Sequence, residues 1–96
     1  MYTLEQAERL AADFLRQESA GSDQEAALID RDSCKGDKGG SFYFAYNSVE
    51  YIATGDDRYA LYGPPAIAVH KETGECRWVD MREFSTVDPF DRRSRR

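Results

Sequence analysis

The chain has 96 residues, a hydrophobic fraction of 41% and a formal net charge of −5. A chain of this length has room for one compact core, so we expect a single domain over residues 1–90. The tail at 91–96 holds four Arg and one Asp and carries +3, which leaves −8 on residues 1–90. This acidic domain argues against a phosphate backbone as ligand and favours basic partners, and we expect the tail to be disordered.

The first element in the chain is an amphipathic helix. Thr3 and Gln6 have the spacing of a capping box, in which each side chain bonds the other residue's amide. Gly21 supplies a left-handed stop. The apolar residues that follow Thr3 recur at the three-and-four spacing of one helix face: Leu4, Ala7, Leu10, Ala11, Phe14 and Leu15.

Two short segments follow the helix. Residues 26–32 are apolar and then charged, which predicts a strand near a sheet edge. Residues 34–40 contain three Gly with alternating charges, which is typical of a mobile connection between antiparallel strands.

A dense aromatic strand is predicted at 42–46. Alternation places Phe42, Phe44 and Tyr46 on one side, toward the helix, and Tyr43 and Ala45 on the other. Cross-strand aromatic pairs stabilise a sheet, so this strand should lie centrally.

Residues 48–62 allow two readings. Ser48 can cap a turn of helix that stops at Gly55, or the same residues can continue as extended chain, and we favour the helical turn. A polar, turn-prone insertion follows at 56–59, and the Gly63, Pro64 and Pro65 run bends the chain into the next strand.

The last strong signal is a hairpin formed by residues 66–70 and 75–80, with Gly74 at the position that requires a positive φ. The alternation leaves open whether Trp78 or Val79 faces the helix. Residues 82–84 fit a short final turn or strand.

These elements predict an α+β fold: an N-terminal amphipathic helix packed on a three- to four-stranded antiparallel sheet. The state of the second sheet face is left open by the sequence; a partly apolar face there would be a candidate contact surface or homodimer interface. Its candidate residues are Tyr43, Tyr51, Tyr59, Tyr62 and either Trp78 or Val79.

No motif for catalysis, metal binding or phosphate binding is present. His70, Cys34 and Cys76 lack zinc spacing, and the paired carboxylates Asp30 with Asp32 and Asp56 with Asp57 lack the other ligands of a calcium loop. We therefore expect no catalytic residues, no metal and no cofactor. A deep pocket around His70 would favour a small-molecule enzyme instead.

The two isolated cysteines and the absence of a signal-peptide pattern favour a cytoplasmic protein with reduced thiols. No apolar run approaches the roughly 20 residues needed to cross a bilayer. We therefore expect neither a membrane nor a nucleic acid as partner.

An ordered series of residues resembles the YrhB-like domain, also called immunity protein 35, over roughly residues 3–80. The opening helix is part of this resemblance. The sequence departs from the pattern at Pro64, where Asn is frequent, and in the Arg-rich end. The series is Phe42-x-Phe44-x-Tyr46-Asn47-Ser48, Tyr51-x-x-Thr54-Gly55-Asp56, Ala60-Leu61-x-Gly63-x-Pro65 and Ile67-x-Val69-x-Lys71-x-Thr73-Gly74.

The resemblance implies a protein that neutralises a co-encoded toxin of a bacterial polymorphic toxin system by binding it, with no catalytic residues. An acidic surface with exposed aromatics suits a basic toxin domain. The candidate contacts lie in one loop: Asp56, Asp57, Tyr59 and Tyr62. The same residues also fit a solvated loop whose tyrosines cap the core. The alternative function is a chaperone-like interaction module that covers apolar client segments through the second sheet face.

Overall fold

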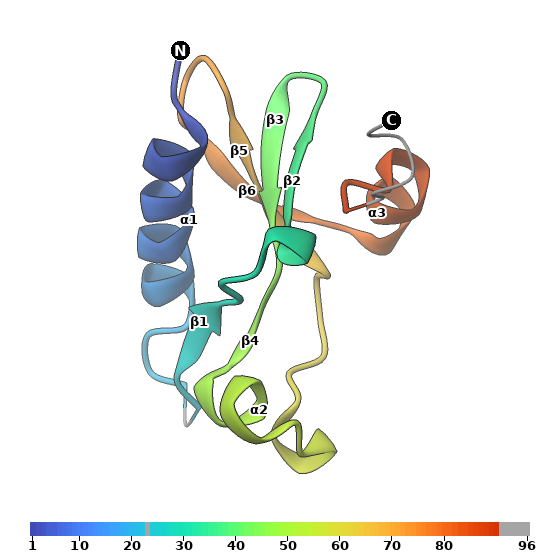
Figure 1. The fold of residues 1–96 in the computed structure, drawn as a ribbon. Coiled ribbons are helices and arrows are strands. Elements are labelled where there is room, and N and C mark those ends of the chain that lie inside the picture. Colours follow the sequence, from blue (N-terminus) through green and yellow to red (C-terminus); the bar gives the residue numbers. More distant parts are fainter. Residues whose placement is uncertain (23, 91–96) are drawn as a thin grey trace.

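The computed structural model describes residues 1–22 and 24–90, so the tail predicted at 91–96 lies outside the described residues. The fold is α+β, as predicted, and Figure 1 shows its arrangement. The elements in chain order are α1 (Leu4–Glu18), β1 (Ala26–Leu28), η1 (Asp32–Cys34), β2 (Lys35–Lys38), β3 (Ser41–Phe44), β4 (Tyr46–Ser48), α2 (Val49–Thr54), η2 (Asp57–Tyr59), β5 (Ala66–His70), β6 (Cys76–Val79) and α3 (Met81–Val87).

Helix α1 begins at the predicted capping box. The Thr3 hydroxyl accepts from the Gln6 amide at 3.1 Å, and the Gln6 side chain accepts from the Thr3 amide at 2.9 Å. Ala7, Ala11 and Leu15 are buried along the apolar face, and the two alanines let the helix approach the sheet closely.

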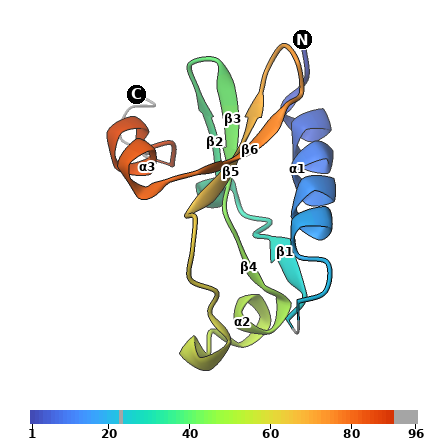
Figure 2. The same ribbon diagram turned by 180° about the vertical axis from the view of Figure 1, so that it is seen from behind.

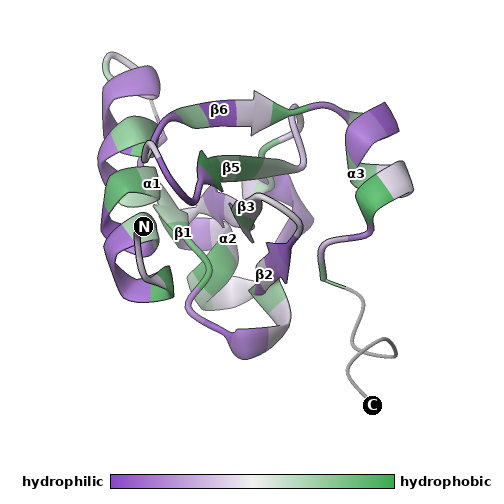
Figure 3. Cartoon of the chain, turned by 90° about the horizontal axis from the view of Figure 1, so that it is seen from above, coloured by the Kyte–Doolittle hydropathy of each residue, from purple (hydrophilic) through white to green (hydrophobic). Residues whose placement is uncertain are grey.

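The main sheet has four antiparallel strands in the order β2-β3-β5-β6. The aromatic strand β3 is central, as predicted, with Phe42 opposite Val69 and Phe44 opposite Ile67. These four side chains are buried under α1 and form the larger core cluster. The strongly apolar strand β5 lies in the middle of the molecule in Figure 3.

The hairpin of β5 and β6 forms as predicted, with Gly74 at φ 74°. Its structure answers the question that the alternation left open. Trp78 packs on the α1 side, 5.2 Å from Phe14 and 5.3 Å from Tyr46 between ring centroids, whereas Val79 is buried on the other face.

The prediction of a mobile connection over 34–40 is wrong. Residues Lys35–Lys38 form the edge strand β2, and only Gly39 and Gly40 form the turn into β3. Gly36 explains the error: it is buried beneath Pro89, and a Cβ atom there would overlap the Pro89 carbonyl oxygen. The glycine therefore marks a close approach of two backbones inside a strand.

The strand predicted at 26–32 is shorter than expected. Only Ala26–Leu28 is a strand, and it pairs with β4 in a separate two-stranded antiparallel sheet. The chain then turns through η1 into β2.

The second sheet face, which the sequence left as an open question, is covered by the end of the described chain. The segment predicted as a short turn or strand at 82–84 is part of helix α3, which lies on the opposite side of the sheet from α1 (Figures 1 and 2). Tyr43 and Val79 are buried there, packed with Phe84, Val87 and Phe90. The homodimer and chaperone hypotheses relied on this face, and α3 with Phe90 covers its apolar residues.

The two ends of the molecule differ. The turns of the β2–β3 and β5–β6 hairpins lie at one end, and α2 with η2 lies at the other (Figure 1). Within the described part of the chain, no helix has the length and apolar character required to span a bilayer.

Candidate functional site

The candidate site is the α2 end, by which we mean β1, β4, α2, η2 and residues 60–65. It begins where the aromatic strand leaves the main sheet at Ala45. The Ala45 amide donates to the Cys34 carbonyl at 3.0 Å, and its own carbonyl accepts from the Ile29 amide at 3.0 Å. The extended run that starts in β3 therefore continues as β4 in the second sheet and carries α2 away from the core (Figure 1).

Ser48 fixes the start of α2. Its side chain is 1% exposed, and its Oγ atom accepts from the Tyr51 amide at 3.0 Å and donates to the Tyr59 carbonyl at 2.5 Å. Gly55 ends the helix in the left-handed conformation at φ 72°. The helical turn that we favoured between Ser48 and Gly55 is therefore confirmed, and its cap also holds η2 in place.

Two more side chains of β4 bind the segment that returns to β5. The Asn47 side-chain oxygen accepts from the Leu61 amide at 2.8 Å, and the Tyr46 hydroxyl donates to the Pro64 carbonyl at 2.8 Å. Partial burial raises the pKa of Tyr46, so the phenol stays protonated and keeps this donor at neutral pH. The loop is thus attached to one strand by three consecutive side chains.

Of the four predicted contact residues, two have internal roles. The Asp56 carboxylate accepts from the Arg58 amide at 3.0 Å and pairs with its guanidinium at 2.7 Å, and these bonds lower the pKa of Asp56. The Tyr59 carbonyl receives the Ser48 hydroxyl, and its half-buried ring lies 5.8 Å from the Arg58 guanidinium carbon.

The other two predicted residues face solvent. Tyr62 is 88% exposed, and Asp57 is exposed with no ion pair among the described residues. The structure therefore places the four predicted residues on one segment but leaves Asp57 and Tyr62 as the pair that a partner can reach.

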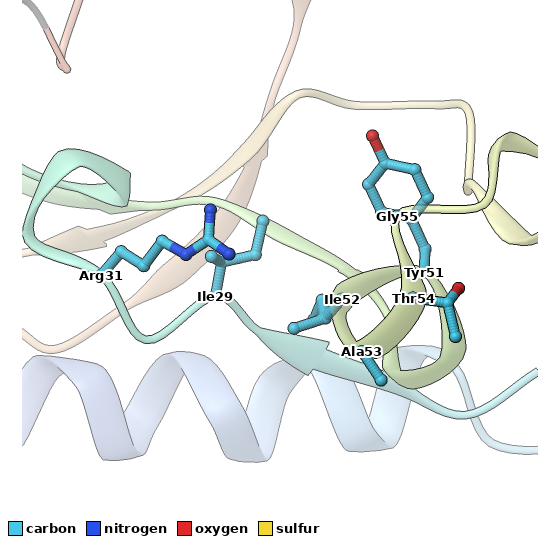
Figure 4. Close-up of a pocket in the computed structure, with 7 residues that line it drawn as sticks. All are labelled: Ile29, Arg31, Tyr51, Ile52, Ala53, Thr54 and Gly55. Carbon is cyan, nitrogen blue, oxygen red and sulfur yellow. The ribbon is translucent and has the colours of Figure 1, made fainter.

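A cavity of about 360 Å³ lies between α2 and the chain that follows β1. Figure 4 shows Ile52 pointing from α2 toward Ile29, with the Arg31 side chain extended toward the same space. Sequence reasoning missed this cavity, because the distant segments around Ile29 and Ile52 meet only when β1 pairs with β4. The apolar start of the strand predicted at 26–32 and the helical turn that ends at Gly55 were the available signals.

Of the residues considered for other chemistry, His70 lines a cavity of about 400 Å³ with Lys71 and Glu72, but it is exposed to solvent and not enclosed by the cavity. The Nδ1 atom of the exposed His70 accepts from the Glu72 and Thr73 amides at 3.2 and 3.3 Å. Both cysteines are free thiols, and burial raises the pKa of Cys76, which disfavours its reactive thiolate. Residues 1–22 and 24–90 contain no group of three His, Cys, Asp or Glu that could hold a metal ion.

Three comparisons with known proteins bear on this site. No family model, no curated protein and no solved structure matches the chain. The likeness to immunity protein 35 therefore stays a prediction that depends on the residues quoted for it, and the function has to be argued from the α2 end itself.

Proposed function

We propose that this chain is an immunity-type protein that neutralises a bacterial toxin by binding it directly, without catalysis, in the cytoplasm. The observation that carries this proposal is the construction of the α2 end. Three neighbouring side chains of β4 hold a loop that exposes Tyr62 and Asp57. A rigid support limits the entropy lost on binding, and an exposed Tyr is a frequent anchor at protein interfaces.

The charge supports a basic partner. Residues 1–90 carry −8, and the α2 end adds Glu50 and Asp57 as exposed carboxylates with no ion pair among the described residues. An acidic surface attracts a cationic protein domain at long range and speeds its association.

The test uses the product of the gene directly upstream as the binding partner. Titration calorimetry at 0.1 M salt would measure its affinity for the wild-type chain and two variants. We expect Tyr62→Ala to weaken binding at least about tenfold, because it removes the exposed anchor. Asp57→Lys should also weaken it about tenfold and lower the association rate.

Glu72→Lys is the matched control for Asp57→Lys. It makes the same charge reversal at an exposed site, but in the β5–β6 turn at the other end of the molecule (Figure 1). We expect it to change the affinity less than threefold, since exposed charges beyond the Debye length are screened. Equal losses for the two reversals would show that net charge, and not the α2 end, sets the affinity.

A second readout tests neutralisation itself. The wild-type chain should abolish the activity of the upstream product at equimolar concentration, whereas Tyr62→Ala should require an excess. Tight binding without loss of activity, or no binding at all, would refute the proposed function.

A further inference from the structure

The cavity beside α2 is lined by apolar side chains, by the polar residues Tyr51 and Thr54 and by one cation. Ile29 and Ile52 both line it, and the Arg31 side chain extends toward the same space (Figure 4). Arg31 is the only charged side chain among the residues that line it. An apolar surface beside a guanidinium matches an apolar group that lies next to a carboxylate.

Arg31, an exposed residue between Asp30 and Asp32, forms no ion pair within the described part of the chain. Two other described cavities are lined by Lys71 and by Arg16, and each of these cations pairs with a carboxylate, Asp37 and Asp13 respectively. Arg31 has no such pair among residues 1–22 and 24–90. In a strongly acidic protein, a cation left without a carboxylate beside an apolar cavity is available to a ligand.

The shape of the site favours a peptide. A volume of about 360 Å³ accommodates one or two residues and is small for an extended ligand. Ala53 and Gly55 line the wall formed by the end of α2, and these small residues leave room for the backbone of a peptide beside the helix.

We propose that this cavity takes a segment of the protein partner in which an apolar side chain is followed directly by a residue with a carboxylate. The apolar side chain contacts Ile29 and Ile52, and the carboxylate pairs with Arg31. This inference rests on the proposed function, because it assigns the cavity to the same partner. The inference adds one feature to a mainly basic partner surface, which is a single acidic residue. Its pairing with Arg31 determines which partner segment occupies the cavity.

The experiment titrates three tripeptides into the ¹⁵N-labelled full chain and follows its amide shifts. The probes are acetyl-Lys-Leu-Glu-amide, the Gln analogue acetyl-Lys-Leu-Gln-amide and the Ala analogue acetyl-Lys-Ala-Glu-amide. We expect the first to shift the amides of Ile29, Ile52 and Gly55 with a millimolar dissociation constant, and the other two to bind about fivefold more weakly. A partly exposed ion pair of about 1 kcal/mol corresponds to that factor.

The Gln analogue is also a control for general attraction. It carries one more positive charge than the Glu peptide, so attraction to an acidic surface alone would make it bind more tightly. Only a specific contact with Arg31 reverses that order.

Two protein variants complete the test. Arg31→Gln should lose the preference for the Glu peptide and bind the Gln peptide at least as tightly, whereas Arg82→Gln, at an exposed position in α3, should keep the fivefold preference of the wild type. The proposal is overturned if the wild type prefers the Gln peptide or if the shifted amides lie outside the cavity. It is also overturned if no peptide binds at a concentration of about 20 mM, well above the expected millimolar dissociation constant. Because the probes are peptides, these outcomes are independent of whether the upstream product is bound.

Discussion

The sheet body and the α2 end are stabilised in different ways. In the body, Phe44, Ile67 and Val69 are at most 1% exposed, and burial between α1 and β3 with β5 provides most of the stability. At the α2 end the described part of the chain has one fully buried side chain, Ser48, and the backbone is positioned by single hydrogen bonds from β4. Buried apolar surface stabilises the sheet body, whereas a few hydrogen bonds from polar side chains hold the α2 end in place.

This difference explains where binding can be located. A partner that contacts the body meets helices whose apolar faces are already used. At the α2 end Tyr62 remains 88% exposed because polar bonds position its backbone without burying its ring. The comparison can be tested by substitutions that act on one region and spare the other.

The largest effect should come from Phe44→Ala in the body. The ring is 1% exposed at the centre of the core, so its loss should lower the free energy of unfolding by about 3 to 5 kcal/mol. Urea denaturation followed by Trp78 fluorescence measures this change. A loss below 1 kcal/mol would mean that the core repacks and that β3 is not its centre.

Gly36→Ala should be the next largest change. The new methyl group meets the Pro89 backbone, so the segment after α3 has to move away from β2, at a cost of about 1 to 3 kcal/mol. Amide exchange in α3 should speed up while exchange in α2 stays unchanged. Gly40→Ala is the control, because a Cβ atom there has no neighbour within 4 Å.

At the α2 end, Ser48→Ala removes one acceptor and one donor from a buried position. We expect a local loss of about 1 to 2 kcal/mol, seen as faster exchange of the Tyr51 and Gly55 amides with little change in β5. Ser85→Ala, at an exposed position in α3, is the matched control. Equal acceleration in β5 would show that the two regions unfold together.

The smallest effect concerns the ion pair that ties α3 to the sheet. Arg77 donates to both carboxylate oxygens of Glu83 at 2.6 Å, which lowers the pKa of Glu83 below its ordinary value of 4.5. A carboxyl with a lowered folded-state pKa stabilises the protein above its unfolded value, and this contribution disappears as the pH falls through the folded value.

Glu83→Gln should therefore cost at most about 1 kcal/mol at pH 7, because the Arg77 side chain is 47% exposed and solvent screens the pair. Below the folded-state pKa of Glu83 the wild type and the variant should have equal stability. Denaturation curves between pH 3 and 7 check this, and a constant difference across that range would contradict the assigned cause.

Much of the body could be predicted because its signals are local. The Thr3 capping box, the alternation of Phe42 and Phe44 and the left-handed turn at Gly74 each depend on neighbours in the sequence. The errors came from long-range packing. Gly36 reads as a flexible residue until Pro89 is seen above it, and α3 is not indicated by its short, mixed sequence.

The site was predictable to a lesser degree for the same reason. Asp57 and Tyr62 fell in a loop that the turn residues identify, and the structure leaves both exposed. The roles of Asn47 and Ser48 depend on a carbonyl and an amide more than ten residues away, which no periodicity encodes. The Arg31 cavity needs the pairing of β1 with β4, and that pairing is set by the whole fold.

The break at Ala45 has a mechanical consequence. Both of its backbone groups are bonded, one to Cys34 and one to Ile29, so the chain changes sheets without a flexible joint. Any rotation of the α2 end relative to the main sheet would have to break one of these two hydrogen bonds first. Tyr62 is therefore presented in one fixed orientation, and a molecule that binds it in another orientation has to adapt its own surface.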